Sequence, residues 1–305
     1  MPEMYFPVVE LKPEWVRAEE QMGSKRKYWV DVNDRVQWLF KFARVNKGVP
    51  TGEHWAEKIA AHVAAVMGLP HAKVELATLE GRPGSLSLRF DELSKPGTAL
   101  AHGNALLPGQ VLGYDSTKKQ RQSDHTLGNI LRVIDHLFKE PAERHKALDL
   151  LMGYLVLDAL VMNTDRHHEN WAVLSQTSST GEANHQMAPT FDHASSLGRE
   201  LTERKIQSWA HDAEHVARYV SKARGAIYRL NTDEHALSPM DVVHLALRMK
   251  GEHVRPWLER LRTLDPQTLV DIVSRVPPTV MGDLHKKFAS DLLRYTLNEL
   301  QQLVT

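Results

Sequence analysis

The sequence predicts an α+β protein with two unequal lobes, a small N-terminal lobe rich in strands and a larger C-terminal lobe that is mostly helical. Short aromatic and β-branched runs between turn residues are frequent up to residue 92, and this composition is typical of strands. Apolar residues at helical spacing dominate the remainder. The 305 residues are enough to bury a core in each lobe. We therefore place the lobes at residues 1–92 and 93–305.

Composition excludes several classes of protein. The chain has 38 basic and 38 acidic residues, so its charge gives no reason to expect direct binding of nucleic acid. It has no cysteine, which rules out disulfides and thiolate zinc sites. The apolar run at 150–162 contains Asp158 and is shorter than the roughly 18 to 20 residues of a membrane span. We expect a cytoplasmic protein without a membrane span.

The N-terminal lobe contains a glycine turn, a strand lysine and a helix glutamate. The turn begins with Gly23, Ser24 and Lys25, and backbone N–H groups of such a turn can bind a phosphate. Lys41 lies in an aromatic strand, and Glu57 lies on the small-residue face of the helix that follows. The elements predicted for this lobe are strands over 28–32, 36–42, 73–79 and 85–91 and a helix over 52–67.

The stretch from 162 to 197 organises the chain. A buried apolar run leads into a polar loop, and two short strands over 171–174 and 187–191 should then form a hairpin. Phosphoryl transfer requires one carboxylate that orients the attacking hydroxyl, and an amide with a second carboxylate that hold Mg²⁺ against the phosphates. Three suitable groups lie at the ends of these elements: Asp165, Asn170 and Asp192.

The spacing of these residues resembles that of kinases. Asp165 and Asn170 are five residues apart, like the base and the metal-binding asparagine of the protein-kinase catalytic loop. The order Asp-Arg-His resembles the phosphatidylinositol 3- and 4-kinases and the bacterial HipA-type serine/threonine kinases, which share their fold. N-T-D-R-H-x-x-N at 163–170 and P-x-F-D at 189–192 are more similar to the HipA type. The resemblance extends over roughly 21–200.

This resemblance implies a two-lobed protein-kinase-like fold that binds ATP and Mg²⁺. Asp165 would orient or deprotonate the acceptor hydroxyl, and His167 would steady the loop or the γ-phosphate. Asn170 and Asp192 would hold the metal. The acceptor would be a protein serine or threonine, and an inhibitory antitoxin-like partner is implied if the chain acts as a toxin. The residues implied in nucleotide binding are Gly23, Ser24 and Lys25 of the phosphate loop, Lys41 with its partner Glu57 (alternatively Glu53), and the hinge backbone around Leu86 and Leu88.

Several positions depart from this family's pattern. Glu169 precedes the metal asparagine where relatives often have lysine, so the added carboxylate could alter metal or substrate preference, or face solvent. Residues 20–22 replace a serine that is autophosphorylated in relatives, and Ser24 is the nearby hydroxyl. The resemblance implies a minimal kinase core without the family's additional N-terminal domain. The basic loop 118–121 is solvated or contacts a peptide substrate.

Three other functions stay open. Phosphoinositide lipid kinases share the catalytic motif, but residues 193–212 mix basic and acidic side chains, which suits an anionic headgroup poorly. A non-catalytic kinase-fold binder would usually lack one of the catalytic groups. His211, Glu214 and His215 match an inverted zinc-peptidase motif on a helix predicted over 201–224. The other helices predicted for this lobe lie at 127–138, 144–162, 239–250, 254–264, 265–276 and 281–303.

Overall fold

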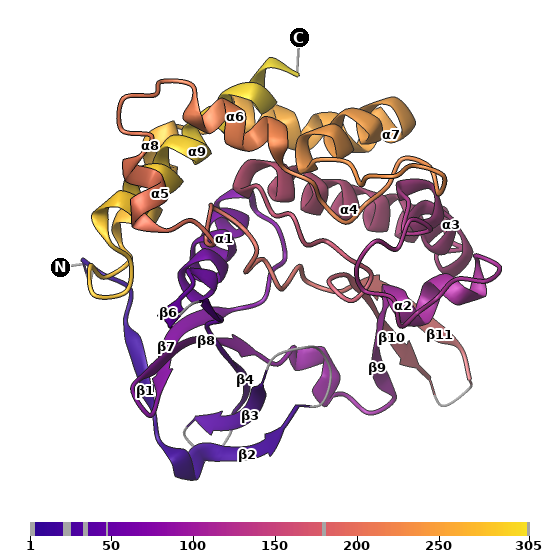
Figure 1. The fold of residues 1–305 in the computed structure, drawn as a ribbon. Helices are drawn as coiled ribbons and strands as arrows, with labels where there is room; N and C mark the ends of the chain where they lie inside the picture. The colour runs from indigo at the N-terminus through magenta and orange to yellow at the C-terminus, as the bar shows by residue number, and fades with distance from the viewer. Residues whose placement is uncertain (1–3, 21–25, 33–35, 47, 179–180, 304–305) are drawn as a thin grey trace.

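The chain folds into a strand-rich part and a larger helical part, with helix α1 (Glu53–Met67) between them (Figure 1). The mixed α+β architecture predicted from the sequence is therefore confirmed. Within the described part of the chain, no helix is both long and apolar enough to cross a membrane. The computed structural model describes residues 4–20, 26–32, 36–46, 48–178 and 181–303.

The small lobe is built on a six-stranded sheet with the strand order β1-β7-β8-β4-β3-β2. Its first pair, β1 with β7, is parallel, and the other pairs are antiparallel. Lys27 pairs with Lys41 across β3 and β4, so both lysines project from the same face of the sheet. The strands are β1 (Val8–Leu11), β2 (Val16–Glu19), β3 (Lys27–Val32), β4 (Val36–Phe42), β7 (Val74–Leu79) and β8 (Arg82–Leu88).

Helix α1 joins the two lobes. A two-stranded ribbon of β5 (Val45–Asn46) and β6 (Val49–Pro50) precedes it, and Gly68 ends it in the left-handed conformation at φ 74°. The helix contacts β7 and β8 of the small lobe as well as helices α4, α7 and α8 of the large one. Glu57 is therefore held at a fixed place behind the sheet and is 1% exposed.

Helix α4 (Pro141–Val161) forms the centre of the large lobe, as the apolar run in the sequence predicts. Every residue from 151 to 161 is buried, and Met162 ends the helix at φ 53°. Helix α7 covers two predicted helices and is kinked at Lys250. The remaining helices are α2 (Gly103–Leu106), α3 (Leu127–Leu137), α5 (Glu203–Gln207), α6 (His215–Lys222), α7 (Pro239–Arg262), α8 (Pro266–Ser274) and α9 (Asp283–Gln302), with 3₁₀ turns at Pro13–Trp15, Asp91–Ser94 and Leu107–Gly109.

A second sheet of three strands lies beside the loop 163–170, which leads into one of its strands. It consists of β9 (Thr98–His102), β10 (Ala172–Thr177) and β11 (Ala183–Met187), in the order β11-β10-β9. The predicted hairpin forms, but its second strand ends at Met187 and does not extend over 187–191. Pro189 cannot donate a ladder hydrogen bond, and Thr190 bridges instead to His71 of the small lobe.

The helix predicted over 201–224 is wrong, because the structure breaks it into α5 and α6. The carboxylate of Asp212 accepts the backbone N–H of Glu214 at 3.1 Å, a local bond that competes with helix continuation. His211 consequently lies in a turn, and His215 begins α6. The zinc-peptidase motif therefore lacks the single helical face that it requires.

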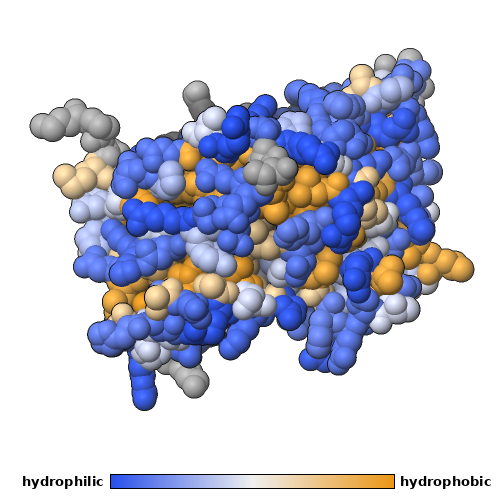
Figure 2. Space-filling model, turned by 90° about the horizontal axis from the view of Figure 1, so that it is seen from above, coloured by the Kyte–Doolittle hydropathy of each residue, from blue (hydrophilic) through white to orange (hydrophobic). Residues whose placement is uncertain are grey.

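The outer face of the helical lobe is largely hydrophilic. Figure 2 views the molecule from above, over the helices at the top of Figure 1, and its apolar side chains lie in bands between hydrophilic ones.

The chain leaves the six-stranded sheet at Leu88 and enters the second sheet at Thr98, a stretch that contains the predicted lobe boundary. Residues of both sheets line one cavity.

Candidate active site

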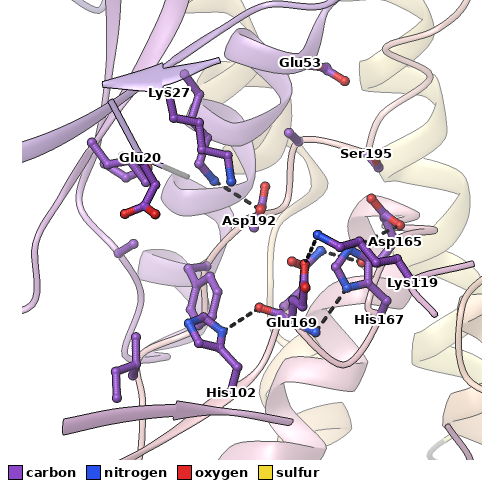
Figure 3. Close-up of a pocket in the computed structure, with 18 of the residues that line it drawn as sticks. Glu20, Lys27, Glu53, His102, Lys119, Asp165, His167, Glu169, Asp192 and Ser195 are labelled. Atoms are coloured by element: carbon purple, nitrogen blue, oxygen red, sulfur yellow. Dashed lines mark hydrogen bonds and ion pairs between the residues drawn. The ribbon is translucent and has the colours of Figure 1, made fainter. Parts of the chain in front are cut away.

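A cavity of about 440 Å³ lies between the lobes (Figure 3), within the size range of small-molecule sites. One part of its wall is apolar and the other is charged, so it can accept a ligand with an apolar end and an anionic end. Figure 3 shows Asp192 near its centre, with Lys27 on one side and Asp165, His167 and Glu169 on the other. The apolar wall includes Leu39, Leu88, Phe90, Leu93, Leu100 and Phe191.

A buried ion pair fixes the loop 163–170 to helix α4. The guanidinium of Arg166 donates from Nε to Asp158 Oδ2 and from Nη2 to Asp158 Oδ1, each at 2.7 Å. It also donates to the carbonyls of Asn170 and Phe191. Burial opposes its charge, but Asp158 outweighs that effect and raises the pKa of Arg166 above its usual value. Arg166 therefore ties the loop that carries Asn170 to the segment that carries Asp192.

The loop 163–170 presents Asp165 to the cavity. Its side chain is 52% exposed, and its carbonyl accepts the Asn170 side-chain N–H at 2.6 Å. Because the amide atoms of Asn170 point to opposite sides, this bond directs the oxygen away from the loop backbone. His167 accepts the backbone N–H of Glu169 on Nδ1, and its Nε2 lies 4.0 Å from Asp165 Oδ1. The loop thus holds the three predicted groups Asp165, His167 and Asn170 together at one wall.

Lys41 and Asp192 meet across the cavity. Lys41 Nζ lies 3.1 Å from Asp192 Oδ2. Burial alone would lower the pKa of Lys41, but the charges of Asp192 and then Glu57 raise it above its usual value. Lys41 therefore stays cationic, which suits the binding of phosphate. Asp192 itself is in the left-handed region at φ 57°, a conformation that Asp and Asn tolerate better than most residues.

Glu57 lies behind Lys41 and is not paired with it in the way the sequence predicts. Its Oε1 lies 3.6 Å from His193 Nδ1, and among the described residues its buried Oε2 has no hydrogen-bond partner. A buried carboxylate oxygen without a donor is costly. The Oε2 atom of Glu57 is therefore a second acceptor for the ammonium group of Lys41. The charge of Glu57 already raises the pKa of that lysine.

The structure places the two leucines of the predicted hinge differently, and the predicted role of their backbone in nucleotide binding stays a prediction. Leu88 lines the cavity, and its backbone N–H donates to the Lys73 carbonyl at 2.9 Å. Leu86 is 1% exposed and belongs to the core of the small lobe, so its side chain is outside the cavity wall. Gly23, Ser24 and Lys25 of the predicted phosphate loop lie outside the described residues.

Glu169 belongs to a polar network that the sequence did not predict. Its carboxylate lies 2.8 Å from Lys119 Nζ, and its carbonyl accepts from His102 Nδ1 at 2.7 Å. Lys119 belongs to the basic loop 118–121, which therefore reaches the cavity, and Figure 3 shows it beside Glu169. Burial lowers the pKa of His102, so its ring is neutral. The added carboxylate thus faces protein groups at the cavity wall.

A second ion pair links α1 to the segment after Asp192. Arg199 Nη1 lies 3.1 Å from Glu53 Oε1, and Glu53 Oε2 accepts the backbone N–H of Arg44 at 3.0 Å. Glu53, the alternative partner for Lys41, thus bridges the lobes, and Glu57 has the stronger effect on the pKa of Lys41.

No role was assigned to Arg166 or Asp158 from the sequence, although their pairing could have been inferred, because a charge inside an apolar helix requires a partner. Arg199 and Lys119 carry no such signal.

A small sheet-rich lobe, a helical lobe and a charged cavity between them define a protein with a kinase-like fold. The chain belongs to the family of the HipA-like C-terminal domain, which matches residues 20–255. The resemblance stated from the motifs is thereby confirmed. Comparison with the curated proteins finds no significant match.

Solved structures show the same fold. The Helicobacter pylori proinflammatory kinase CtkA is similar with a TM-score of 0.77 at 19% identity, over 98% of this chain and 99% of that one. HipA of the Shewanella oneidensis MR-1 toxin–antitoxin system, solved with HipB and operator DNA, has a TM-score of 0.60 at 14% identity. That match covers 93% of this chain and 64% of HipA. At these identities the similarity establishes the fold alone.

Proposed function

We propose that the protein is an ATP- and Mg²⁺-dependent kinase that phosphorylates a serine or threonine hydroxyl of a protein. One observation carries the proposal, namely that Lys41, Asp192, Asn170 and Asp165 all line one cavity with an apolar end. The apolar end suits a nucleobase, and the cationic side chains beside Asp192 suit phosphates. Asn170 and Asp192 supply oxygen atoms, which are the ligands that Mg²⁺ prefers.

The residues of the cavity would divide the work of phosphoryl transfer. Mg²⁺ held by Asn170 and Asp192 would neutralise charge on the phosphates. Lys41 would then leave Asp192 and place its ammonium group between the phosphates and Glu57, whose buried Oε2 can accept it. Asp165 would orient the acceptor hydroxyl and take its proton. Arg166 would act only as a positioning residue, since it is buried and bonded to Asp158.

The acceptor proposed is a protein and not a lipid headgroup. Two arginines after Asp192 are paired within the protein, Arg199 with Glu53 and Arg218 with Asp212, and Lys205 lies over the ring of Trp209. An anionic headgroup would need unpaired cations there. A non-catalytic role is less well supported, because each group required for transfer lines the cavity or lies directly behind it.

An inhibitory protein partner is part of this proposal. The HipA structure contains HipB, which is described with it as a toxin–antitoxin system. The family membership of this chain supports a search for a comparable small partner, and for toxicity of the chain when that partner is absent. Co-purification from cells with stoichiometric recovery of one protein would support this part.

The nucleotide prediction can be tested by thermal unfolding. ATP should raise the melting temperature slightly without Mg²⁺ and clearly with it, because a ligand that binds the native state stabilises it by mass action. Asp192→Asn should remove the Mg²⁺-dependent part, and asparagine is suited to the left-handed backbone at this position. An equal shift in the presence of EDTA would contradict the metal roles. Labelled ATP and cell lysate would then reveal whether protein hydroxyls are phosphorylated.

A further inference from the structure

A cluster of two histidines and one aspartate lies where α4 meets α7. The donor atoms of His145, Asp149 and His253 all lie within 4.8 Å of one another. His145 and Asp149 are one turn apart on α4, and His253 comes from α7, just after the kink at Lys250. None of the three is among the described residues that line the cavity. The cluster is therefore separate from the nucleotide site.

The packing of α4 against α7 brings these three side chains together. Positions four residues apart form a ridge on a helix, and Asp149 and Gly153 on α4 face His253 and Trp257 on α7. The indole N–H of Trp257 donates to the carbonyl of Asp149 at 2.7 Å. A Cβ atom on Gly153 would lie 2.6 Å from the Trp257 ring, so the helices approach closely beside the cluster. The close packing of α4 on α7 thus fixes the backbone positions from which Asp149 and His253 project.

The donor set suits a divalent metal ion, and one of the two donor separations already has the required length. His145 Nε2 lies 3.3 Å from Asp149 Oδ2, close to the ligand–ligand separation of about 3.4 Å that bonds of about 2.0–2.1 Å give in a tetrahedral site. His253 Nδ1 is hydrogen-bonded to Asp149 Oδ1 at 2.5 Å, so a metal ion would replace this bond and move the two atoms apart. On its other side, His253 Nε2 lies 3.7 Å from Glu252 Oε1. Metal-bound histidines usually donate the second ring N–H to a carboxylate, a carbonyl or water, and Glu252 lies near enough to reach this position.

We propose that His145, Asp149 and His253 bind a zinc-type divalent cation that fastens α4 to α7. Two imidazoles and a carboxylate are typical zinc ligands, and a water molecule would complete the tetrahedron. The negative charges of Asp149 and Glu252 would balance the ion. His253 is 5% exposed as a residue and His145 has a side chain that is 66% exposed, so the ion could enter from solvent.

Zinc binding to untagged, chelator-treated protein tests the proposal. Calorimetry should show one equivalent of Zn²⁺, and Co²⁺ should give the visible absorption of a tetrahedral site. His145→Ala removes an exposed side chain and should weaken binding by at least about 100-fold, since even an outer-shell partner contributes about 10- to 100-fold. Zn²⁺ should also raise the melting temperature of the wild type and not that of this variant.

Two variants serve as controls. His136→Ala removes an exposed histidine from helix α3 and should leave Zn²⁺ affinity unchanged. Asp192→Asn alters the nucleotide cavity and should likewise retain one equivalent, so the outcome is independent of the kinase proposal. Absence of stoichiometric binding would overturn the inference. So would binding that survives His145→Ala, or binding that is lost in Asp192→Asn, because the ion would then lie elsewhere.

Discussion

Asp165 and Lys41 have different tasks in the proposed reaction, and their surroundings reflect this difference. Asp165 is half exposed at the loop, where an acceptor can reach it. Lys41 is largely buried, and its charge is held by Asp192 and Glu57. One residue would therefore act on the acceptor and the other on the nucleotide. Replacing Asp165 should therefore impair the chemical step, whereas replacing Lys41 should impair the binding of ATP.

Asp165→Asn should keep ATP affinity and lower kcat and kcat/KM together, because the interaction forms mainly in the transition state. Loss of a general base typically costs about 10²- to 10⁴-fold. Lys41→Ala should raise KM for ATP, since it removes ground-state binding of the phosphates. Steady-state kinetics with ATP titration measures both, and the exposed Lys73→Ala is the control. Full transfer by Asp165→Asn would refute its assignment.

Buried neutral histidines should make the fold sensitive to acid. His125 donates from Nδ1 to the Ala226 carbonyl and accepts the Trp171 indole N–H on Nε2, so its ring is neutral. Burial lowers the pKa of His125 to about 3 and that of His168 to about 4. Unfolded histidines titrate near about 6.5, so between pH 6.5 and 4 the unfolded state binds more protons. Their contribution to stability is complete above about pH 6.5 and is lost as the pH falls.

Melting temperatures between pH 8 and 5 measure this effect. The free energy of unfolding should fall by up to about 1.4 kcal/mol per pH unit for each such histidine. Glutamine can donate and accept without titrating, so His125→Gln should flatten the dependence. His136→Gln, which changes an exposed histidine of α3, should leave it unchanged. An identical slope in all three proteins would rule out this source of acid sensitivity.

For single residues, the sequence could predict which side chains lie together when the chemistry requires them at a fixed spacing in the chain. Asp165 and Asn170 are held in one short loop, so their juxtaposition follows from five residues of chain. The pairing of Lys41 with Asp192 depends on how two lobes meet, and no local pattern encodes it. The same holds for Lys119 with Glu169. Partners that are distant in sequence require the structure.

Helices were predictable from the sequence where an apolar segment is buried. They were less predictable at the surface, where side-chain hydrogen bonds to the backbone compete with helix formation. Helix α4 is buried over its last eleven positions, from 151 to 161, so its apolar run leaves no alternative. The segment 201–224 is mostly at the surface, where a single Asp212 side chain can interrupt it. The strand predicted over 187–191 lies instead at Ala183–Met187, because Pro189 cannot donate a ladder hydrogen bond. Both errors lie at exposed or element-ending positions.

Two helical glycines should respond oppositely to alanine. A Cβ on Gly153 of α4 would lie 2.6 Å from atoms of both Trp257 and Leu69, so Gly153→Ala should destabilise by about 1–3 kcal/mol through overpacking. On Gly128 of α3 the nearest atom would be 3.9 Å away. Gly128→Ala should therefore be neutral or stabilise by up to about 1 kcal/mol. Denaturant unfolding measures both, and a stabilising Gly153→Ala would disprove the close packing of α4 on α7.

At the scale of the whole molecule, the two-lobed architecture followed from the order of strand-rich and helix-rich segments. The cavity did not, because its walls come from β3, β4 and β8 of one lobe and from β9 and several loops of the other. Ion pairs such as that of Arg199 with Glu53 fix the position of one wall relative to the other. Such pairs join surfaces whose relative position the sequence pattern leaves undefined.

The kink in α7 has a consequence for the exchange of amide hydrogens with solvent. Lys250 has φ −145° and ψ 48°, and Pro256 has no N–H to offer the carbonyl four residues earlier, so the hydrogen-bond ladder is interrupted twice. Amides near 250–254 should exchange through local opening, faster than those of the long helix α9. Mass spectrometry of deuterated peptides can measure the difference. If a metal ion joins His253 to α4, Zn²⁺ should slow exchange at the kink and leave α9 unaffected.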